Sequence, residues 1–464
     1  MFRGRVRHVH FVGVGGIGMS GLAEILRTLE FDVSGSDLRE GENTRRLLRL
    51  GVRIDVGHRA ENVVGADVVV QSSAIGPDNP ELIEAGRLGI PVISRAEMLA
   101  ELMRVKYGIA IAGSHGKTTT TSLVATVLRA AGFDPTVVVG GRMQALGTNA
   151  RLGAGDLLVA EADESDGSFL RLSPTIAVVT NIDPEHLDYF GSYDALKDAF
   201  LAFLEKVPFY GLAVLCLDHP AVQDLLPRLP RRHVTYGLSP QADYSARAVQ
   251  FRGLTTSFVA YRRGEPLGEF AIKMPGQHNV LNALAAIATA DELEVPLDVI
   301  KDAIATFHGV ARRFSIVAEI AGTTLVDDYG HHPAEVVATL EAARRAYDGR
   351  VLVLFQPHRY TRTQLLFDDF TRAFNNADRL VLLDIYAAGE KPIEGVSAAR
   401  LAQAIAAHGH HGVGYAASKA EACAVLAEEA RPGDVLIALG AGDVNRLLAD
   451  IAKQLEARKL EVAR

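Results

Sequence analysis

The sequence predicts an α/β protein built from several domains in series. Short apolar runs rich in β-branched residues alternate with amphipathic helical patterns along most of the chain. Such alternation is typical of βαβ units around a parallel sheet. The chain has 464 residues, whereas a single hydrophobic core stops growing at about 250–300 residues. In addition, polar clusters follow many of the predicted strands, and the ends of parallel strands are where open α/β sheets bind ligands.

Changes in the pattern divide the chain at two places. Residues 1–106 alternate strands such as HVHFVGV and FDVSGSD with helices. Residues 107–313 begin with the strand GIAIAGS and contain the irregular stretch DYSARAVQFRGLTTSFVAYRRGEPLGEFAIKM, in which we expect antiparallel strands. Residues 314–464 return to α/β winding, with strands such as RVLVLFQP and GDVLIALG. We therefore expect three domains with these limits, of which the first and the last are Rossmann-like.

The composition argues against several classes of partner. The formal net charge is -8 and no long basic run is present, which disfavours binding to nucleic acid. The two cysteines, Cys216 and Cys423, form no C-x-x-C pair, so we expect no zinc site and no disulfide, as suits a reducing compartment. The start of the chain lacks the apolar core of a signal peptide, and no apolar run reaches the length of a membrane span. We expect a cytoplasmic protein without a membrane partner.

A glycine-rich loop follows the first predicted strand. Gly13, Gly15 and Gly18 fit the pattern G-x-G-x-x-G, and Asp37 follows about twenty positions later. Bare glycine backbone at a helix N-terminus suits a pyrophosphate. Taken alone, the pattern predicts an NAD-dependent oxidoreductase. That interpretation leaves a second glycine loop without a role, so it stands as an alternative.

The second loop follows the strand GIAIA and opens a helix. It consists of Gly113, Ser114, His115, Gly116, Lys117, Thr118 and Thr119. In such a loop the lysine reaches the outer phosphates of a nucleotide and the threonine hydroxyl binds Mg²⁺. The two glycines are separated by two residues, where the usual P-loop has four. The alternative is a tight glycine turn, but a Lys-Thr pair at the helix start has no packing reason. We therefore expect the central domain to be a P-loop-type ATPase domain.

Two acidic clusters follow later strands of the central domain. The first comes after DLLVA and the second after IAVVTN; their members are Glu161, Asp163, Glu164 and Asp166, then Asp183, Glu185, His186 and Asp188. A carboxylate at the end of a parallel strand, beside a triphosphate, would hold Mg²⁺. Glu161 stands closest to its strand and is the metal candidate, with His186 as a second ligand. Several of the others are expected to be solvated loop residues.

Further polar residues lie near the two domain limits. Asn279 and Asn282 are three positions apart, and thus on one face of a helix; they could read an adenine edge or cap the helix. Arg313 belongs to an arginine pair suited to phosphoryl charge or to an ordinary surface. In the third domain, two clusters follow apolar strands; they comprise Asp327, Asp328, Tyr329, His331 and His332, then His358, Arg359, Tyr360 and Arg362. We expect the later turn ALGAGD to be structural.

These residues predict metal-assisted phosphoryl transfer to a substrate that binds elsewhere on the chain. No nucleophile elbow and no reactive cysteine motif is found in the sequence. A P-loop NTPase that acts as a switch or a transport motor is the second alternative. It leaves the first glycine loop without a role.

The ordered set of motifs resembles the Mur ligase family, which builds the peptide stem of peptidoglycan. The motifs span the chain; they are GSHGKTTT, EADESD, TNIDPEHLD, GQHNVLNA, GVARRF, DDYGHHP and FQPHRYTRT. GVGGIGMSGLAEIL and DDYGHHPAE are most similar to members that attach L-alanine to UDP-N-acetylmuramate. A sister branch attaches a preformed tripeptide to the same sugar nucleotide, and its N-terminal glycine loop differs.

The resemblance implies a role for each matched residue. The first domain would bind the UDP-sugar through Gly15, Gly16, Ile17, Gly18, Asp37 and Ser72. ATP would contact the second loop from Gly113 to Thr119, with Asn279 and Asn282 at the adenine and Asp328 near the ribose. Thr118, Glu161 and His186 would hold Mg²⁺, or Mn²⁺ in its place. Lys117, His186, Arg313 and His331 would be catalytic, while Tyr329, His358, Arg359 and Arg362 would face the amino acid. Several relatives carry a carbamylated lysine, for which Lys197 is the nearest match.

The implied reaction agrees with the chemistry that the residues suggest. The carboxylate of UDP-N-acetylmuramate attacks the γ-phosphate of ATP, and the amine of L-alanine then displaces phosphate from the acyl phosphate. The enzyme supplies positioning and charge neutralisation and no nucleophile of its own. His331 could assist deprotonation of the amine.

Overall fold

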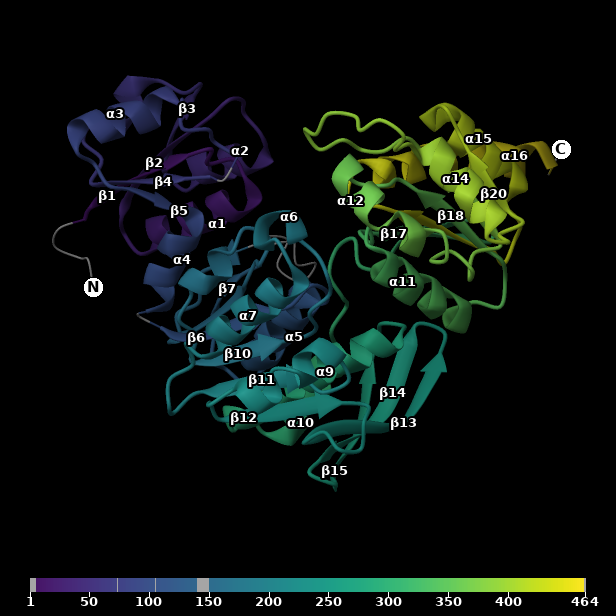
Figure 1. The fold of residues 1–464 in the computed structure, drawn as a ribbon, viewed down its shortest axis with the longest axis horizontal. Coiled ribbons are helices and arrows are strands. Elements are labelled where there is room, and N and C mark those ends of the chain that lie inside the picture. The colour runs from purple at the N-terminus through teal and green to yellow at the C-terminus, as the bar shows by residue number, and fades with distance from the viewer. Residues whose placement is uncertain (1–5, 73, 105, 140–149, 463–464) are drawn as a thin grey trace. The chain divides into compact units, whose positions relative to one another are not determined.

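The computed structural model describes residues 6–72, 74–104, 106–139 and 150–462 and contains three β-sheets with helices around them (Figure 1). Contacts divide the chain into two compact units, of which the first comprises residues 1–247, 259–270 and 281–308 and the second the remainder. The three sheets lie one after another along the chain, which confirms the α/β class. The limits of the three domains stay predictions.

The first sheet is parallel throughout, with the strand order β3-β2-β1-β4-β5. Its elements are β1 (His8–Val12), α1 (Ile17–Thr28), β2 (Asp32–Asp37), α2 (Glu42–Arg49), β3 (Arg53–Val56), β4 (Val68–Gln71), α3 (Pro80–Leu88), β5 (Val92–Ser94) and α4 (Arg95–Met103). The chain order changes direction between β1 and β4. The first glycine loop follows β1 and therefore lies at the switch point, where such sheets bind ligands.

The second sheet has ten strands in the order β15-β14-β13-β12-β11-β10-β6-β9-β7-β8. The strands are β6 (Tyr107–Ala112), β7 (Thr136–Val138), β8 (Ala150–Arg151), β9 (Leu157–Glu161), β10 (Ile176–Val179), β11 (Leu212–Cys216), β12 (His233–Gly237), β13 (Tyr244–Arg252), β14 (Thr255–Arg262) and β15 (Glu265–Ile272). Strand β6 pairs in parallel with β9 on one side and β10 on the other. The loops after these three strands, which carry the second glycine loop and the acidic clusters, therefore leave one sheet edge side by side.

Helices of the same part of the chain flank this sheet. They are α5 (Lys117–Ala130), α6 (Leu187–Phe190), α7 (Tyr193–Leu204), α8 (Pro220–Gln223), α9 (Gln277–Glu292) and α10 (Leu297–Ala305), with a 3-10 turn at Ser168–Arg171. The irregular stretch forms β13 to β15 as three successive strands. This confirms strands where the sequence predicted them.

The third sheet has the order β16-β17-β21-β18-β19-β20, and only its edge strand β16 is antiparallel to its neighbour. Its elements are β16 (Ser315–Ile320), β17 (Thr323–Asp328), α11 (Pro333–Ala346), β18 (Val351–Phe355), α12 (Tyr360–Leu365), α13 (Phe367–Phe370), β19 (Arg379–Leu382), α14 (Ala398–Ala407), β20 (Val413–Tyr415), α15 (Lys419–Glu429), β21 (Val435–Leu439) and α16 (Leu447–Val462). Because β17 and β18 both pair with β21, the two polar clusters of this domain leave neighbouring strands.

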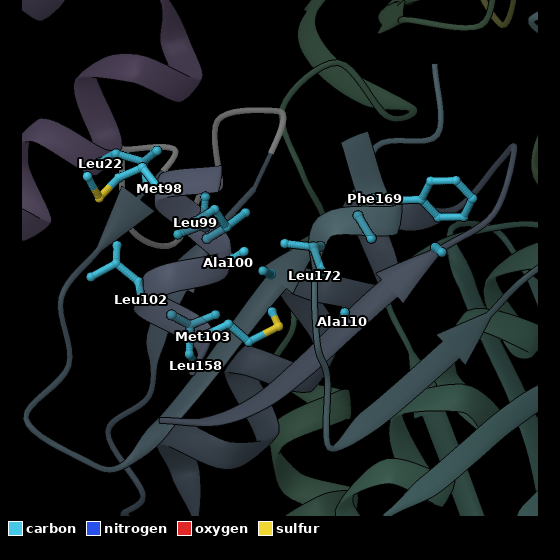
Figure 2. Close-up of a cluster of buried hydrophobic side chains, with 14 of the residues drawn as sticks. Leu22, Met98, Leu99, Ala100, Leu102, Met103, Ala110, Leu158, Phe169 and Leu172 are labelled. Carbon is cyan, nitrogen blue, oxygen red and sulfur yellow. The ribbon is translucent and has the colours of Figure 1, made fainter. Parts of the chain in front are cut away.

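Helix α4 packs against both sheets of the first unit. Figure 2 shows Met98 beside Leu22 of α1, and Met103 beside Leu158 of β9. These side chains are at most 3% exposed. Full burial of a side chain of this size stabilises the fold by about 1.5–3 kcal/mol, so α4 joins the first sheet to the second through one continuous core. Among the described residues, no helix combines the length and apolar character that crossing a membrane requires.

Candidate active site

The second glycine loop is held in place by contacts with the residues that follow β10. Gly113 lies at φ +134°, and a side chain there would clash with the hydroxyl of Thr180. Gly116 lies at φ +82° and is the N-cap of α5. The backbone N–H of His115 donates to Oδ1 of Asn181 at 2.7 Å, and the Asn181 amide donates back to the His115 carbonyl at 3.0 Å. The loop was predicted from the sequence, but its hydrogen bonds with Asn181 were not.

Lys117 folds back over the loop that precedes it. Its Nζ donates to the carbonyls of Gly113 at 2.5 Å and Ser114 at 3.1 Å, and to the carboxylate of Glu164 at 2.9 Å. Burial alone would lower the pKa of Lys117, but the neighbouring carboxylates, Glu164 foremost, raise it. Burial raises the pKa of Glu164 to about 7. The lysine therefore carries its positive charge at neutral pH.

Thr118 and Glu161 meet as the metal prediction requires. The Thr118 hydroxyl lies 3.2 and 3.0 Å from the two carboxylate oxygens of Glu161. Thr118 belongs to the first turn of α5, and Glu161 is the last residue of β9. A hydroxyl and a carboxylate are hard oxygen ligands of the kind that Mg²⁺ binds. Their contact follows from the parallel pairing of β6 and β9.

Asp183 connects the loop to a histidine that the sequence analysis did not single out. One carboxylate oxygen lies 3.0 Å from Nε2 of His115, and the other lies 3.2 Å from Nε2 of His219. Burial opposes ionisation of Asp183, but these two hydrogen bonds outweigh it and hold the pKa of Asp183 well below its usual range. His219 lies just before α8, without a motif to reveal it.

His186 has carboxylates around it, as predicted. It lies at φ +55°, a conformation uncommon for a non-glycine residue. One ring nitrogen of His186 and carboxylate oxygens of Glu164 and Glu185 all lie within 4.8 Å of one another. Glu161, which the resemblance implies as the other ligand of the same ion, contacts the hydroxyl of Thr118. The His186 group can hold a cation.

The two asparagines of α9 are both buried. Asn282 accepts a hydrogen bond from the Thr120 hydroxyl at 3.1 Å, and a side chain at Gly116 would meet its Oδ1 at 2.7 Å. Asn282 thus packs directly on the second glycine loop. Asn279 donates to the Pro275 carbonyl at 2.7 Å.

The first glycine loop uses its own N–H groups internally. Gly13 and Val14 donate to the Ser36 carbonyl at 2.9 and 3.0 Å. Gly15 donates to Oδ2 of Asp37 at 2.8 Å, and Gly16 donates to the Gly13 carbonyl at 3.2 Å. Asp37, predicted near the uridine, therefore holds the loop in shape.

The other residues predicted for the UDP-sugar surround this loop. Ser72 follows β4 and lies against Gly13, and Gly18 lies in the first turn of α1. Helix α1 begins at Ile17, whose side chain is outside the described residues.

In the second unit, Asp328 is buried within its own domain. Its carboxylate accepts from the backbone of Phe314 at 2.7 Å and Gly330 at 2.8 Å, and from the Thr339 hydroxyl at 3.2 Å. Burial raises the pKa of Asp328, against the attraction of Arg313. Arg313 forms an ion pair with Glu335 at 3.1 Å. Asp328 shapes the start of the third domain.

Aromatic and basic side chains form a row in the same unit. The ring of His331 lies edge-on to Tyr329 and to His358, at centroid distances of 5.3 and 5.8 Å. The ring of Tyr386, which was not predicted, stacks on His358 at 5.6 Å. Arg362 donates to Nδ1 of His358 at 3.3 Å.

Two further observations concern residues of this row and its neighbours. Burial and the positive charges of its neighbours lower the pKa of His358 to about 4, so this ring is neutral at physiological pH. Arg359 lies at φ +69° with its backbone N–H on the Tyr386 carbonyl at 2.9 Å. Strained backbone of this kind clusters at functional sites.

Lys197 lies apart from these groups. Its Nζ pairs with Asp194 at 2.9 Å and Asp224 at 3.5 Å. The hydrogen bond with Asp194 raises the pKa of Lys197. Carbamylation requires a neutral amine, so these partners disfavour it. In the turn after β21, the carbonyls of Gly440 and Gly442 accept hydrogen bonds from Arg312.

Family models match most of the chain in consecutive segments. They are Mur ligase family, catalytic domain, at residues 8–107; Mur ligase middle domain, at 111–290; and Mur ligase, glutamate ligase domain, at 312–442.

Known proteins are similar over nearly the full length. The chain is 74% identical over 461 residues to a UDP-N-acetylmuramate–L-alanine ligase of Sorangium cellulosum, covering 99% of this chain and 98% of the relative. It is 60% identical over 456 residues to the protein of that name from Anaeromyxobacter dehalogenans, covering 98% and 99%. The crystal structure of UDP-N-acetylmuramate–alanine ligase from Thermotoga maritima matches with a TM-score of 0.80 at 30% identity, covering 97% and 99%. The chain therefore belongs to the Mur ligase family.

Proposed function

We propose that this enzyme joins L-alanine to the lactyl carboxylate of UDP-N-acetylmuramate at the expense of ATP, in the synthesis of peptidoglycan precursors. The proposal rests on the grouping of Lys117 and Thr118 with Glu164 and Glu161 beside the second glycine loop. The relatives from Sorangium and Anaeromyxobacter, which bear the name of this activity, support the choice of substrates.

The second glycine loop would bind the triphosphate. Lys117 has a raised pKa and is held by carbonyls and by Glu164. It therefore offers a fixed positive charge, and phosphate oxygens can take the place of its present hydrogen-bond partners. Asn282 packs on the same loop, which supports an adenine site at α9. A Mur ligase of Thermotoga maritima crystallised with ADP has the same fold, with a TM-score of 0.65.

The chain offers two places for Mg²⁺. Thr118 and Glu161 fit it because they present hydroxyl and carboxylate oxygens about 3 Å apart at a helix start. Glu164, Glu185 and His186 form the second group. When bound, Mg²⁺ neutralises the charge that develops on the transferred phosphoryl group. Mn²⁺ prefers similar ligands.

The reaction then proceeds in two displacements. A carboxylate oxygen of the muramoyl group attacks the γ-phosphorus, the bond to the β-γ bridging oxygen breaks, and ADP leaves. The amine of L-alanine attacks the acyl carbon, loses a proton, and inorganic phosphate leaves from the tetrahedral intermediate. Lys117 and Arg313 would stabilise negative charge, and His331 would accept the amine proton.

The row of rings in the second unit would receive L-alanine. His358 has a lowered pKa and accepts a hydrogen bond at Nδ1 from Arg362, so its Nε2 carries the proton and donates. Tyr329, Arg359 and Arg362 would bind the amino acid around it. The first glycine loop and Ser72 would hold the UDP-sugar, as bare backbone at a helix start suits a diphosphate.

The test is phosphate release from ATP and Mg²⁺ in the presence of UDP-N-acetylmuramate and one amino acid at a time. We expect the most release with L-alanine and weaker but measurable release with glycine or L-serine, because a pocket discriminates only modestly between substrates that differ by a single group. No release with L-alanine would refute the proposal. Release only with L-alanyl-γ-D-glutamyl-meso-diaminopimelate would identify the sister activity. NADH binding with fluorescence quenching would support the oxidoreductase alternative.

A further inference from the structure

A cavity of about 180 Å³ opens within the first unit, between the first and second sheets. It is lined by Gln71, Ser94, Arg95, Ala96, Asp166, Ser168 and Arg171. Gln71 ends β4, Ser94 ends β5 and Arg95 begins α4, so the cavity lies at the ligand-binding edge of the first sheet. A single water needs only about 10–15 Å³. The cavity is therefore large enough for part of a substrate.

One wall of the cavity touches the first glycine loop. A side chain at Gly18 would meet Cδ of Arg95 at 2.9 Å and Nη1 at 3.1 Å. The Arg95 guanidinium thus lies over the first turn of α1, where a diphosphate bound at this helix start would rest. The opposite wall comes from the loop after β9 and the 3-10 turn at Ser168–Arg171.

The charges that line the cavity are unequally compensated. Arg171 forms an ion pair with Glu97 of α4. Asp166 accepts from the backbone of Ser168 at 3.0 Å. Within the part of the chain that the structure describes, the Arg95 guanidinium forms neither a hydrogen bond nor an ion pair, and it attracts Asp163 only through space. Arg95 is thus the positive charge of this cavity that is available to an anion.

The first glycine loop itself offers few groups to an anion. The N–H groups of residues 13–16 are all donated to acceptors within the protein. Helix geometry leaves only the N–H groups of the first turn of α1 for a phosphate. The loop has no lysine of its own, unlike the second loop. A doubly charged diphosphate at this place would therefore find a full positive charge only on a residue from another element.

We infer that Arg95 binds the diphosphate of the UDP-sugar, and that the adjoining sugar enters the cavity beside it. Gln71, Ser94 and Ser168 offer polar atoms for sugar hydroxyls. This orientation places the uridine at the β2 side of the sheet, near Asp37, and directs the sugar toward the loop after β9. The inference deepens the proposed function and rests on it for the identity of the sugar.

The test measures binding by calorimetry of two probes, UDP-N-acetylmuramate and UDP, to the full chain. Arg95→Gln should weaken both by roughly 10- to 100-fold, because a charge-assisted pair is lost. Arg95→Lys keeps the charge without the planar guanidinium, so its affinity for both probes should lie between those of the unmodified protein and Arg95→Gln. Arg87→Gln is the matched control, since Arg87 is an exposed arginine that pairs with Glu84 on α3. It should bind both probes as the unmodified protein does.

The outcomes separate the assignments. Unchanged binding in Arg95→Gln, with an unchanged melting temperature, would overturn the role of Arg95. Loss of UDP-N-acetylmuramate binding with UDP binding intact would overturn the diphosphate contact. If the unmodified protein binds UDP but not UDP-N-acetylmuramate, the proposed function fails, and the effect of Arg95→Gln on UDP still decides the role of Arg95. The KM for ATP should remain unchanged in Arg95→Gln.

Discussion

The two glycine loops of this protein follow the first strand of their sheets and open a helix, but they differ in what they offer a phosphate. The second loop carries Lys117 and Thr118 on its own helix, and the neighbouring strand β9 supplies Glu161 and Glu164. The first loop carries no charged residue, and the N–H groups of residues 13–16 are already donated. A shared glycine pattern thus indicates a similar backbone turn before a helix. The surrounding charges decide which ligand is bound and whether a phosphoryl group is transferred.

The largest difference should come from the charge of the second loop. Lys117→Ala should lower kcat by on the order of 10³-fold or more, because the phosphoryl group loses its fixed positive charge. Phosphate release under saturating substrates measures the effect. Lys206→Ala removes an exposed lysine of the same domain and should leave kcat unchanged.

Loss of Lys117 also leaves a buried carboxylate without its partner. The double variant Lys117→Ala/Glu164→Gln should therefore melt closer to the unmodified protein than the single variant. Near-normal turnover in either variant would refute the assignment of the second loop.

The backbone of the second loop should tolerate a side chain less well than that of the first. Gly113→Ala should lower the free energy of unfolding by about 2–4 kcal/mol, since a clash with Thr180 adds to the strain of φ +134°. Gly13→Ala should cost about 1–2 kcal/mol, because φ is +81° but the nearest atom lies 3.2 Å away. Urea unfolding of the two variants gives the comparison. Equal losses would contradict the idea that the second loop is the more tightly held.

Metal dependence should belong to the second loop alone. Glu161→Gln should raise the Mg²⁺ concentration needed for half-maximal activity by roughly 10- to 100-fold. Asp156→Asn, at the opposite end of the β9 region, is the matched control and should leave it unchanged. Removal of Mg²⁺ with EDTA should abolish phosphate release while UDP binding to the first loop persists. An Mg²⁺ requirement for UDP binding would break this distinction.

Each loop is also held by one aspartate, and the two should differ modestly in strength. Asp183→Asn should cost about 1–2 kcal/mol at pH 7, since Asp183 accepts from two histidines. Asp37→Asn should cost about 0.5–1.5 kcal/mol, because Asp37 accepts from the Gly15 N–H. The lowered pKa of Asp183 means that its contribution is present above about pH 3.8, its unfolded value, and is lost as the pH falls through the folded value. The free energy of unfolding of Asp183→Asn and of the unmodified protein, measured at pH 7 and at pH 3, tests this. The difference between the two proteins should be smaller at pH 3.

Much of the fold could be predicted because parallel strands buried on both faces are apolar along their whole length. The runs at β6, β18 and β21 show this pattern plainly. Short edge strands such as β3 and β20, which are partly exposed, lack it and were not predicted. Residues that act through a neighbour were also missed, for instance Asn181, His219 and Tyr386, because no spacing along the chain records a contact between different loops.

The sequence alone determined the α/β class, the two glycine loops and the residue types that phosphoryl transfer needs, since each is a local pattern. Only the tertiary structure decided how these groups are used. Strand pairing brought Thr118 to Glu161 and His186 to Glu164. The packing of α4 against both sheets placed Arg95 over Gly18, 77 positions away in the chain. The physical reason is that one short segment can encode its own backbone turn and hydrogen bonds. Charge complementarity instead depends on which distant segments the packing of the core places next to each other.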